Sequence, residues 1–242
     1  EIALLSLWLV EHQMNILFKN TFGRVAAALP LRQGGNILSG NAISTDWPKF
    51  CPINGNSKVF VLGNPPYLGS KNQEENHKKD LALMFSEIKG SGILDYISCW
   101  IAKAADYARF QNVEFAFVST NSISQGEQVG ILWKELFSNY GIKIHFAHQT
   151  FNWSNEAKSN AAVHVVIVGF ASFDTTNKRI FEYEDIKSDA HEKVVKNINP
   201  YLVEGDDIVV TKRNKPLLNN PSMLLGNMPN DGGFLMLTNE EK

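Results

Sequence analysis

The chain has 242 residues, of which 44% are hydrophobic and 20% charged, and its formal net charge is -2. This length can bury one sizeable core, and the composition is ordinary for a globular protein in water. No apolar run is long enough to span a membrane and no signal peptide opens the chain, so we expect a cytoplasmic protein without membrane partners. The two cysteines, Cys51 and Cys99, lie in unrelated contexts. They argue against a disulfide scaffold and against a thiolate zinc site.

The first quarter of the chain contains one predicted helix and two predicted strands. Residues 2–18 are mostly apolar, and we expect a largely buried helix there. Residues 36–38 are compatible with a short strand, and Gly40 and Asn41 follow it directly. Residues 59–62 form a short apolar run that stops at Gly63, which predicts a buried strand.

Strands and helices alternate through the middle of the chain. Apolar residues recur at helical spacing over residues 93–108, and residues 114–119 predict a strand. Ser124 and Glu127 have the spacing of a capping box before a helix that Gly141 should end. Residues 142–148 and 161–170 predict two more strands. Because no helix separates these two strands, we expect an antiparallel pair at a sheet edge. The alternation indicates an α/β fold.

The character of the chain changes near its end. From about Ile198 onward, prolines and glycines punctuate the sequence, among them Pro200, Gly205 and Pro216. Such residues are typical of a linker or of the opening of another region rather than of a core. We therefore divide the chain into a main domain, residues 1–198, and a second region, residues 199–242.

The tetrapeptide Asn64-Pro65-Pro66-Tyr67 carries the most chemical information. It directly follows a predicted strand, and ligands of open α/β sheets bind beyond the carboxyl ends of the strands. A carboxamide oxygen and a rigid backbone carbonyl can each accept one N–H bond of an exocyclic amino group on a base, which localises the lone pair of the nitrogen. Asn64 supplies the first acceptor and Pro65 the second, whose direction Pro66 helps to fix. Tyr67 offers a ring on which a flipped base can stack.

Two other interpretations concern this tetrapeptide and a pair of histidines further along the chain. A tetrapeptide of this kind also occurs in ordinary tight turns, although the strand before it favours a site. His145 and His148 suggest a metal, but a spacing of three on a strand puts the two side chains on opposite faces. We therefore predict no metal site.

Longer stretches around the tetrapeptide carry a resemblance to a known family. They are, in chain order, residues 63–71 with their continuation at 92–96, residues 117–123, residues 125–133 and residues 151–158. Together they resemble the gamma-type N6-adenine DNA methyltransferase region of single-chain type II restriction–modification enzymes (MmeI-like). The resemblance covers nearly the whole chain in the same order, and it implies a Rossmann-like methyltransferase core that uses S-adenosylmethionine.

The resemblance implies roles for the residues that would hold the target base. Asn64 and Pro65 would bind the amino group of an adenine flipped out of double-stranded DNA, and Tyr67 would stack on the base. Phe151, in the late aromatic motif of the family, would stack on the other face, with Trp153 as the second choice. The same tetrapeptide also occurs in methyltransferases that act on RNA or on protein glutamine. Those activities, and a non-catalytic DNA-binding fragment, remain the alternatives.

Other residues would contact the cofactor and the DNA backbone. The resemblance places Asn41, Ala42 and Asn64 at the cofactor, although an acidic residue is common at the position of Asn41. Lys71 and Lys158 are candidates for contacts with DNA phosphates, and a solvated surface is as compatible with the sequence. The net charge of -2 is low for a DNA-binding domain, so most phosphate contacts would come from outside this chain.

One part of the family pattern has no counterpart in the sequence. Neither the glycine-rich cofactor loop nor the acidic residue for the cofactor ribose is found. We therefore expect a methyltransferase core that is incomplete at the N-terminus, without the first two strands of the family sheet. The missing partners would be the N-terminal methyltransferase and nuclease regions and the C-terminal target-recognition region of the same prokaryotic polypeptide. We predict weak or no cofactor binding and little activity for this chain alone. We also predict either disturbed packing around residues 1–45 or dependence on another chain to fill the gap.

Overall fold

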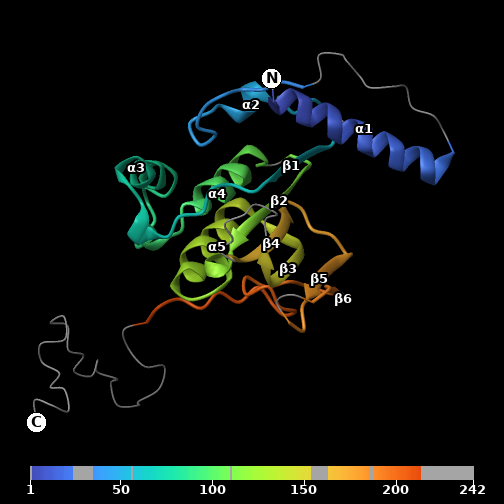
Figure 1. Cartoon of the computed structure of the whole chain (residues 1–242). Helices are drawn as coiled ribbons and strands as arrows, with labels where there is room; N and C mark the ends of the chain where they lie inside the picture. The colour runs from blue at the N-terminus through green and yellow to red at the C-terminus, as the bar shows by residue number, and fades with distance from the viewer. Residues whose placement is uncertain are drawn as a thin grey trace, which may run out of the picture.

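A mixed six-stranded sheet organises the chain in the computed structural model, which describes residues 2–23, 35–55, 57–109, 111–153, 163–185 and 188–213 (Figure 1). The strand order is β1-β2-β4-β3-β5-β6. The strands are β1 (Val59–Gly63), β2 (Val113–Thr120), β3 (Lys143–Trp153), β4 (Val163–Ala171), β5 (Lys178–Glu182) and β6 (His191–Val195). The α-helices are α1 (Ile2–Phe22), α2 (Trp47–Phe50), α3 (Glu75–Met84), α4 (Ile97–Tyr107) and α5 (Glu127–Tyr140). Short 3-10 helices are η1 (Ser70–Asn72), η2 (Ser91–Ile93) and η3 (Asn121–Ser124).

The pairing of the strands brings the ends of β1, β2 and β3 to one edge of the sheet. β1 lies parallel to β2, with Gly63 opposite Phe117. β4 is antiparallel to both β2 and β3, so β3 runs in the same direction as β1 and β2. Val165 of β4 lies opposite Thr120 on one side and opposite Phe151 on the other. The residues that follow Gly63 and the end of β3 therefore share the carboxyl edge of the sheet.

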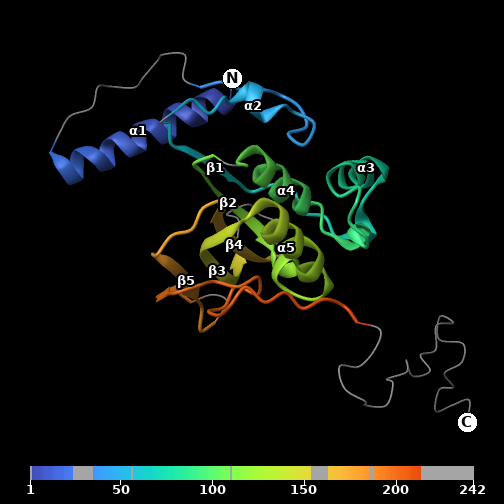
Figure 2. The ribbon, with the colours of Figure 1, turned by 180° about the vertical axis from the view of Figure 1, so that it is seen from behind.

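Helices α4 and α5 lie side by side against the sheet in both views of the ribbon (Figures 1 and 2). They form the core with the apolar side chains of β2 and β4, where the rings of Phe115 and Phe170 lie 4.9 Å apart. Trp133 of α5 is fully buried, and its indole N–H donates to the Ile123 carbonyl at 2.6 Å. A side chain at Gly169 would overlap the ring of Phe146. The close approach of β3 to β4 therefore requires glycine at this position.

The middle of the chain confirms most of the predicted elements. β2, α4 and α5 form where the apolar spacing predicts them, and Gly141 ends α5 in the left-handed conformation. The predicted capping box is wrong. The residue before α5 is Gly126, without a side-chain cap, because the Ser124 hydroxyl donates instead to the Asn121 carbonyl within η3.

The predicted antiparallel pair is confirmed as β3 and β4, but its predicted place at a sheet edge is wrong. β5 lies parallel to β3 on the outer side, and β6 follows antiparallel to β5. The sequence analysis missed both strands. Their alternation is masked by charged residues, including Lys178, which is 1% exposed. Its ammonium group lies 2.6 Å from Asn197 Oδ1 and 2.8 Å from Asp174 Oδ1.

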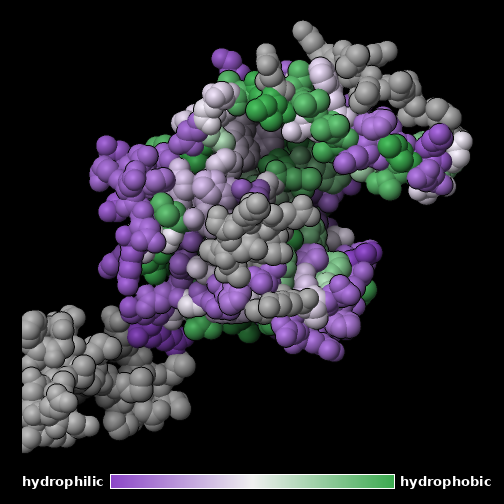
Figure 3. Space-filling view, in the orientation of Figure 1, coloured by the Kyte–Doolittle hydropathy of each residue, from purple (hydrophilic) through white to green (hydrophobic). Residues whose placement is uncertain are grey.

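The N-terminal part is less buried than predicted. Residues 2–22 form the predicted helix, but α1 buries none of its residues. Residues 36–38 are not a strand, because no described strand pairs with them. β1 is a strand but not a buried one, since it is the edge strand and leaves Phe60 and Leu62 56% and 74% exposed. Hydrophobic residues gather over α1 and around the hollow beneath it (Figure 3).

The segment after β6 packs on the core, which the sequence analysis did not predict. Ile198 and Leu202 are 1% and 2% exposed and belong to the core cluster. The Lys143 ammonium group binds Asp207 at 2.7 Å, and Lys212 binds Glu127 at 2.9 Å. Residues 198–213 are thus docked on the sheet and α5, and the division at residue 198 stays a prediction. In the described part of the chain, no helix has the length and apolar character needed to cross a membrane.

Candidate active site

The turn Asn64-Pro65-Pro66-Tyr67 leaves the carboxyl end of β1, as the sequence predicts. Pro65 is buried, while Asn64 is exposed and its carboxamide makes no hydrogen bond to any described residue. Tyr67 is half-buried and packs on the core. The carboxamide of Asn64 is therefore available to a ligand, while the residues on either side of it are fixed by the sheet and by proline geometry.

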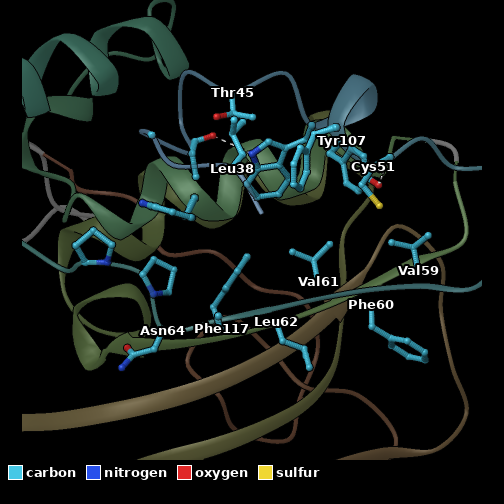
Figure 4. Close-up of a pocket in the computed structure, with 18 residues that line it drawn as sticks. Leu38, Thr45, Cys51, Val59, Phe60, Val61, Leu62, Asn64, Tyr107 and Phe117 are labelled. Atoms are coloured by element: carbon cyan, nitrogen blue, oxygen red, sulfur yellow. Dashed lines mark hydrogen bonds between the residues drawn. The ribbon is translucent and has the colours of Figure 1, made fainter. Parts of the chain in front are cut away.

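A cavity of about 510 Å³ opens beside this turn (Figure 4). Asn64, Pro65 and Pro66 line it from the turn, and Ala42 lines it from the segment before α2. The side chains of Val59 and Val61 point into it from β1 (Figure 4). The other lining residues are Leu38, Gly40, Thr45, Trp47, Phe50, Cys51, Phe60, Leu62, Gly63, Trp100, Tyr107 and Phe117. The size and the apolar walls suit a ligand with a flat ring.

The lining residues fit only part of the expected cofactor. Apolar side chains around Ala42 suit a purine ring, and Asn64 marks the end of the cavity at which the reacting methyl group would lie. The described lining residues include no Asp or Glu, so nothing on this wall can bind the two hydroxyl groups of a ribose through a carboxylate. The described walls of the cavity therefore fit a purine ring, but they carry no carboxylate for a ribose.

Asn41 does not line this cavity, and its side chain is used within the chain. Its Oδ1 accepts the N–H of Ile43 at 2.9 Å, and its Nδ2 donates to Asp80 Oδ2 at 3.1 Å. The hydroxyl of Tyr96 donates to the same carboxylate oxygen at 2.6 Å. Burial, followed by the hydrogen bond to Asp80, raises the pKa of Tyr96. The sequence analysis missed Asp80, because residues 39 positions apart gave no local signal of this contact.

Phe151 does not line the cavity either, but it lies near the end of β3 in an aromatic cluster. Its ring is stacked on Tyr183 with centroids 5.1 Å apart and planes inclined by 19°. The Tyr183 hydroxyl lies 2.8 Å from Nδ1 of His148, whose ring is stacked on Phe181 at 4.1 Å. Burial lowers the pKa of His148 and favours its neutral form. The sequence analysis did not find Tyr183, because β3 and β5 had to be paired before the two rings could be placed together.

Lys71 and His145 do not line this cavity. Lys71 is an exposed residue of η1, and Lys158 falls outside the described residues, as does the side chain of Trp153. His145 Nε2 lies 2.8 Å from the Phe173 carbonyl. In the described part of the chain, no group of three His, Cys, Asp or Glu side chains is placed to hold a metal ion.

Two family models together match most of the chain. Residues 1–182 match the model of the MmeI DNA-methyltransferase domain. Residues 204–242 match the model of the MmeI target recognition domain. The second match begins within the segment that is docked on the core, after Leu202.

Two known proteins are similar over nearly the whole chain. DNA methyltransferase A of Bacillus subtilis (strain 168) is 50% identical over 240 residues, which is 98% of this chain and 26% of that protein. The structure of the type IIL restriction-modification enzyme MmeI in complex with DNA is 45% identical, with a TM-score of 0.81, and the match covers 97% of this chain and 31% of that one. This likeness confirms the predicted Rossmann-like methyltransferase fold. The chain spans only about a quarter to a third of the length of these relatives.

Proposed function

Since the chain belongs to the MmeI DNA-methyltransferase family, we propose that it methylates the N6 amino group of adenine in double-stranded DNA. The methyl donor is S-adenosylmethionine, and the chain acts as part of a longer restriction–modification polypeptide. The observation that carries the proposal is the turn at the edge of the cavity. There the Asn64 carboxamide, which makes no hydrogen bond to a described residue, lies beside the buried Pro65.

The turn supplies two acceptors for one amino group. The amino nitrogen of adenine is a poor nucleophile, because its lone pair is delocalised into the ring. Asn64 Oδ1 and the Pro65 carbonyl each accept one N–H of this group, which draws the nitrogen toward tetrahedral geometry and localises the lone pair. Preorganised acceptors of this kind lower the barrier by positioning and by electrostatics.

Aromatic side chains hold the flipped base. Tyr67 stacks on one face of the adenine, and Phe151 contacts it from the end of β3. Gly63 and Phe151 lie at the same carboxyl edge of the sheet, which supports a base bound between them. A base extruded from a duplex loses its stacking there and regains it on such rings.

The cofactor is bound by residues of this chain and of the rest of the polypeptide together. S-adenosylmethionine supplies an electrophilic methyl group on a sulfonium. Ala42 and the apolar walls of the cavity bind its purine, and Asn64 lies at the reactive end. Asn41 does not line the cavity, but its hydrogen bonds to Ile43 and Asp80 hold the segment that carries Ala42. The carboxylate for the ribose comes from outside the described residues.

The DNA is held by further regions of the polypeptide as well as by this chain. The relative MmeI was solved in complex with DNA, and the match of residues 204–242 to a target recognition domain supports recognition outside the catalytic core. Lys71 and Lys158 contact phosphates near the target base. The division of the chain into a catalytic part, residues 1–198, and the opening of the recognition region, residues 199–242, belongs to the same proposal.

The test uses the full-length polypeptide, its Asn64→Ala variant and an Asn54→Ala control, in which another exposed asparagine near β1 is changed. Each is incubated with labelled S-adenosylmethionine and, in separate reactions, with unmodified duplex DNA, RNA or protein. The labelled products are digested and identified by mass spectrometry. We expect label on adenine from the parent and the control, and none from Asn64→Ala. Label on RNA or protein instead of DNA would replace the proposal with one of the other activities. Transfer to no substrate would indicate a non-catalytic DNA-binding role.

A further inference from the structure

Both main-chain groups of Leu68, the residue after the catalytic turn, are held by distant parts of the chain. The Leu68 N–H donates to Asp95 Oδ1 at 2.8 Å. The Leu68 carbonyl accepts the Tyr96 N–H at 3.0 Å and Gln73 Nε2 at 2.8 Å. Leu68 is therefore fixed on both sides of its backbone, although it lies in a segment without regular structure.

Asp95 joins this segment to three other elements. Its carboxylate also accepts the Ile97 N–H at 3.3 Å, at the start of α4, and the Thr120 hydroxyl at 3.3 Å, at the end of β2. The Asp95 N–H donates to Gln128 Oε1 of α5 at 2.8 Å. Asp95 is 3% exposed, and no described cation pairs with its carboxylate. A buried carboxylate is costly unless donors surround it, and here each donor belongs to an element that meets at the carboxyl edge.

The catalytic turn is anchored at both ends and stiff in the middle. At its start, Gly63 is in register with Phe117 of β2. At its end, Leu68 is held by Asp95. The two prolines between these anchors restrict the backbone dihedral angles. The directions of the Asn64 side chain and of the Pro65 carbonyl therefore depend on the position of Leu68.

We propose that Asp95 is a positioning residue for methyl transfer, which holds Leu68 so that Asn64 and Pro65 point at the target amino group. This inference rests on the proposed function of the turn. Asp95 acts through the backbone and touches neither base nor cofactor. A displacement of about 1 Å in a group that positions a substrate can cost on the order of 10²-fold in rate.

The experiment compares three variants of the full-length polypeptide. Asp95→Ala removes the acceptor for Leu68. Asp95→Asn keeps an acceptor oxygen, and its amide nitrogen can donate to the Thr120 hydroxyl. Ser98→Ala is the control, because Ser98 is buried in α4 and its hydroxyl has no hydrogen-bond partner in the described part of the chain. We expect kcat to fall on the order of 10²-fold in Asp95→Ala, with KM for DNA and for S-adenosylmethionine little changed, and to recover largely in Asp95→Asn.

Hydrogen exchange of the peptide spanning residues 64–70 gives a second readout that needs no activity. The Leu68 amide should exchange faster in Asp95→Ala than in the parent, the Asn variant or the Ser98→Ala control. Wild-type kcat with wild-type exchange in Asp95→Ala would overturn the inference, as would an equal loss of kcat in Ser98→Ala. If Asp95→Ala does not fold, Thr120→Val, which removes one of the bonds to Asp95, should show a smaller change in the same two readouts. If the parent methylates no adenine, the proposed function fails. Hydrogen exchange then still tests whether Asp95 holds the backbone of Leu68.

Discussion

The ring of Tyr183 is stacked on that of Phe151, with centroids 5.1 Å apart and planes inclined by 19°. Tyr183 follows β5, and Phe151 lies near the end of β3, so the contact joins two parts of the sheet edge where the target base is proposed to bind. Tyr183 therefore sets the orientation of a ring that Phe151 would offer to the base.

Tyr183→Ala should weaken the stacking of Phe151 on the flipped base, because it removes the ring that packs on Phe151. A stacked aromatic pair contributes about 0.5–1.5 kcal/mol beyond its buried area, so we expect kcat/KM to fall roughly 2- to 10-fold. The fluorescence of 2-aminopurine at the target position reports how the extruded base is stacked, and it should change in this variant. Tyr183→Phe keeps the stacking ring and loses the hydroxyl, so it should resemble the parent. An equal effect of both substitutions would contradict the stacking explanation.

The neutral form of His148 should make stability depend on pH. Burial lowers the pKa of this imidazole below its usual 6.5. Below about pH 6.5 the unfolded chain takes up a proton that folded His148 resists, so its contribution is complete above that pH and is lost as the pH falls through the folded pKa. For one proton the slope is at most about 1.4 kcal/mol per pH unit.

This dependence can be measured by urea denaturation of the parent and of His148→Gln at about pH 8 and about pH 5.5. All other titrating groups are shared by the two proteins. The parent should lose more stability than the variant on acidification. A variant that loses as much as the parent would show that other groups carry the pH dependence.

Gly130 of α5 should be needed for the docking of the segment after β6. A Cβ at this position would lie 2.8 Å from the Val210 carbonyl oxygen. Alanine favours a helix over glycine by about 0.5–1 kcal/mol, but here it must displace the chain near Val210. We therefore expect Gly130→Ala to weaken the adjacent ion pair between Lys212 and Glu127.

Limited digestion with trypsin measures this displacement as cleavage after Lys212. The rate should increase in Gly130→Ala. Gly92→Ala is the control, because a Cβ at Gly92 meets nothing within 4 Å. Equal cleavage of parent and Gly130→Ala would show that the segment does not rely on this contact.

The chain by itself should bind S-adenosylmethionine weakly. The described cavity wall carries no carboxylate for the ribose, and among the described strands β1 pairs with β2 alone. Isothermal calorimetry should therefore give no micromolar binding to residues 1–242, and clear binding to the full-length polypeptide. Micromolar binding to the shorter chain would show that its own residues complete the site.

The sequence predicts best those elements whose signals are local. The apolar spacing of α5 and the glycine at position 141 depend on neighbours within a few residues, and both predictions are confirmed. The prediction of a strand at residues 36–38 is wrong, because a strand needs a hydrogen-bonded partner and apolar character alone does not supply one. The prediction that α1 is buried is wrong for a related reason. The sequence of a helix that is apolar on all sides does not show which other part of the protein covers it.

The sequence predicts only the part of the candidate site whose signal is local. The turn from Asn64 to Tyr67 is contiguous, so its motif is visible in the sequence. Asp95 binds Leu68, the residue after the turn, from 27 positions away. Tyr183 stacks on Phe151 from another strand, and both contacts exist only after the strands have been arranged. Asp95 lies within a stretch that resembles the family, but its part in holding Leu68 depends on a backbone N–H that no side-chain pattern indicates.

The docked segment also affects the order in which the chain can fold during synthesis. The family match to the methyltransferase domain ends at residue 182, yet Val195, Ile198 and Leu202 complete the core. Domains generally fold as units, the N-terminal domain first, as the chain leaves the ribosome. Here the turn from Asn64 to Tyr67 emerges long before the residues that close the core, which border on the match to the recognition domain. A nascent chain therefore cannot complete this core until synthesis has passed Leu202, next to the match to the recognition domain.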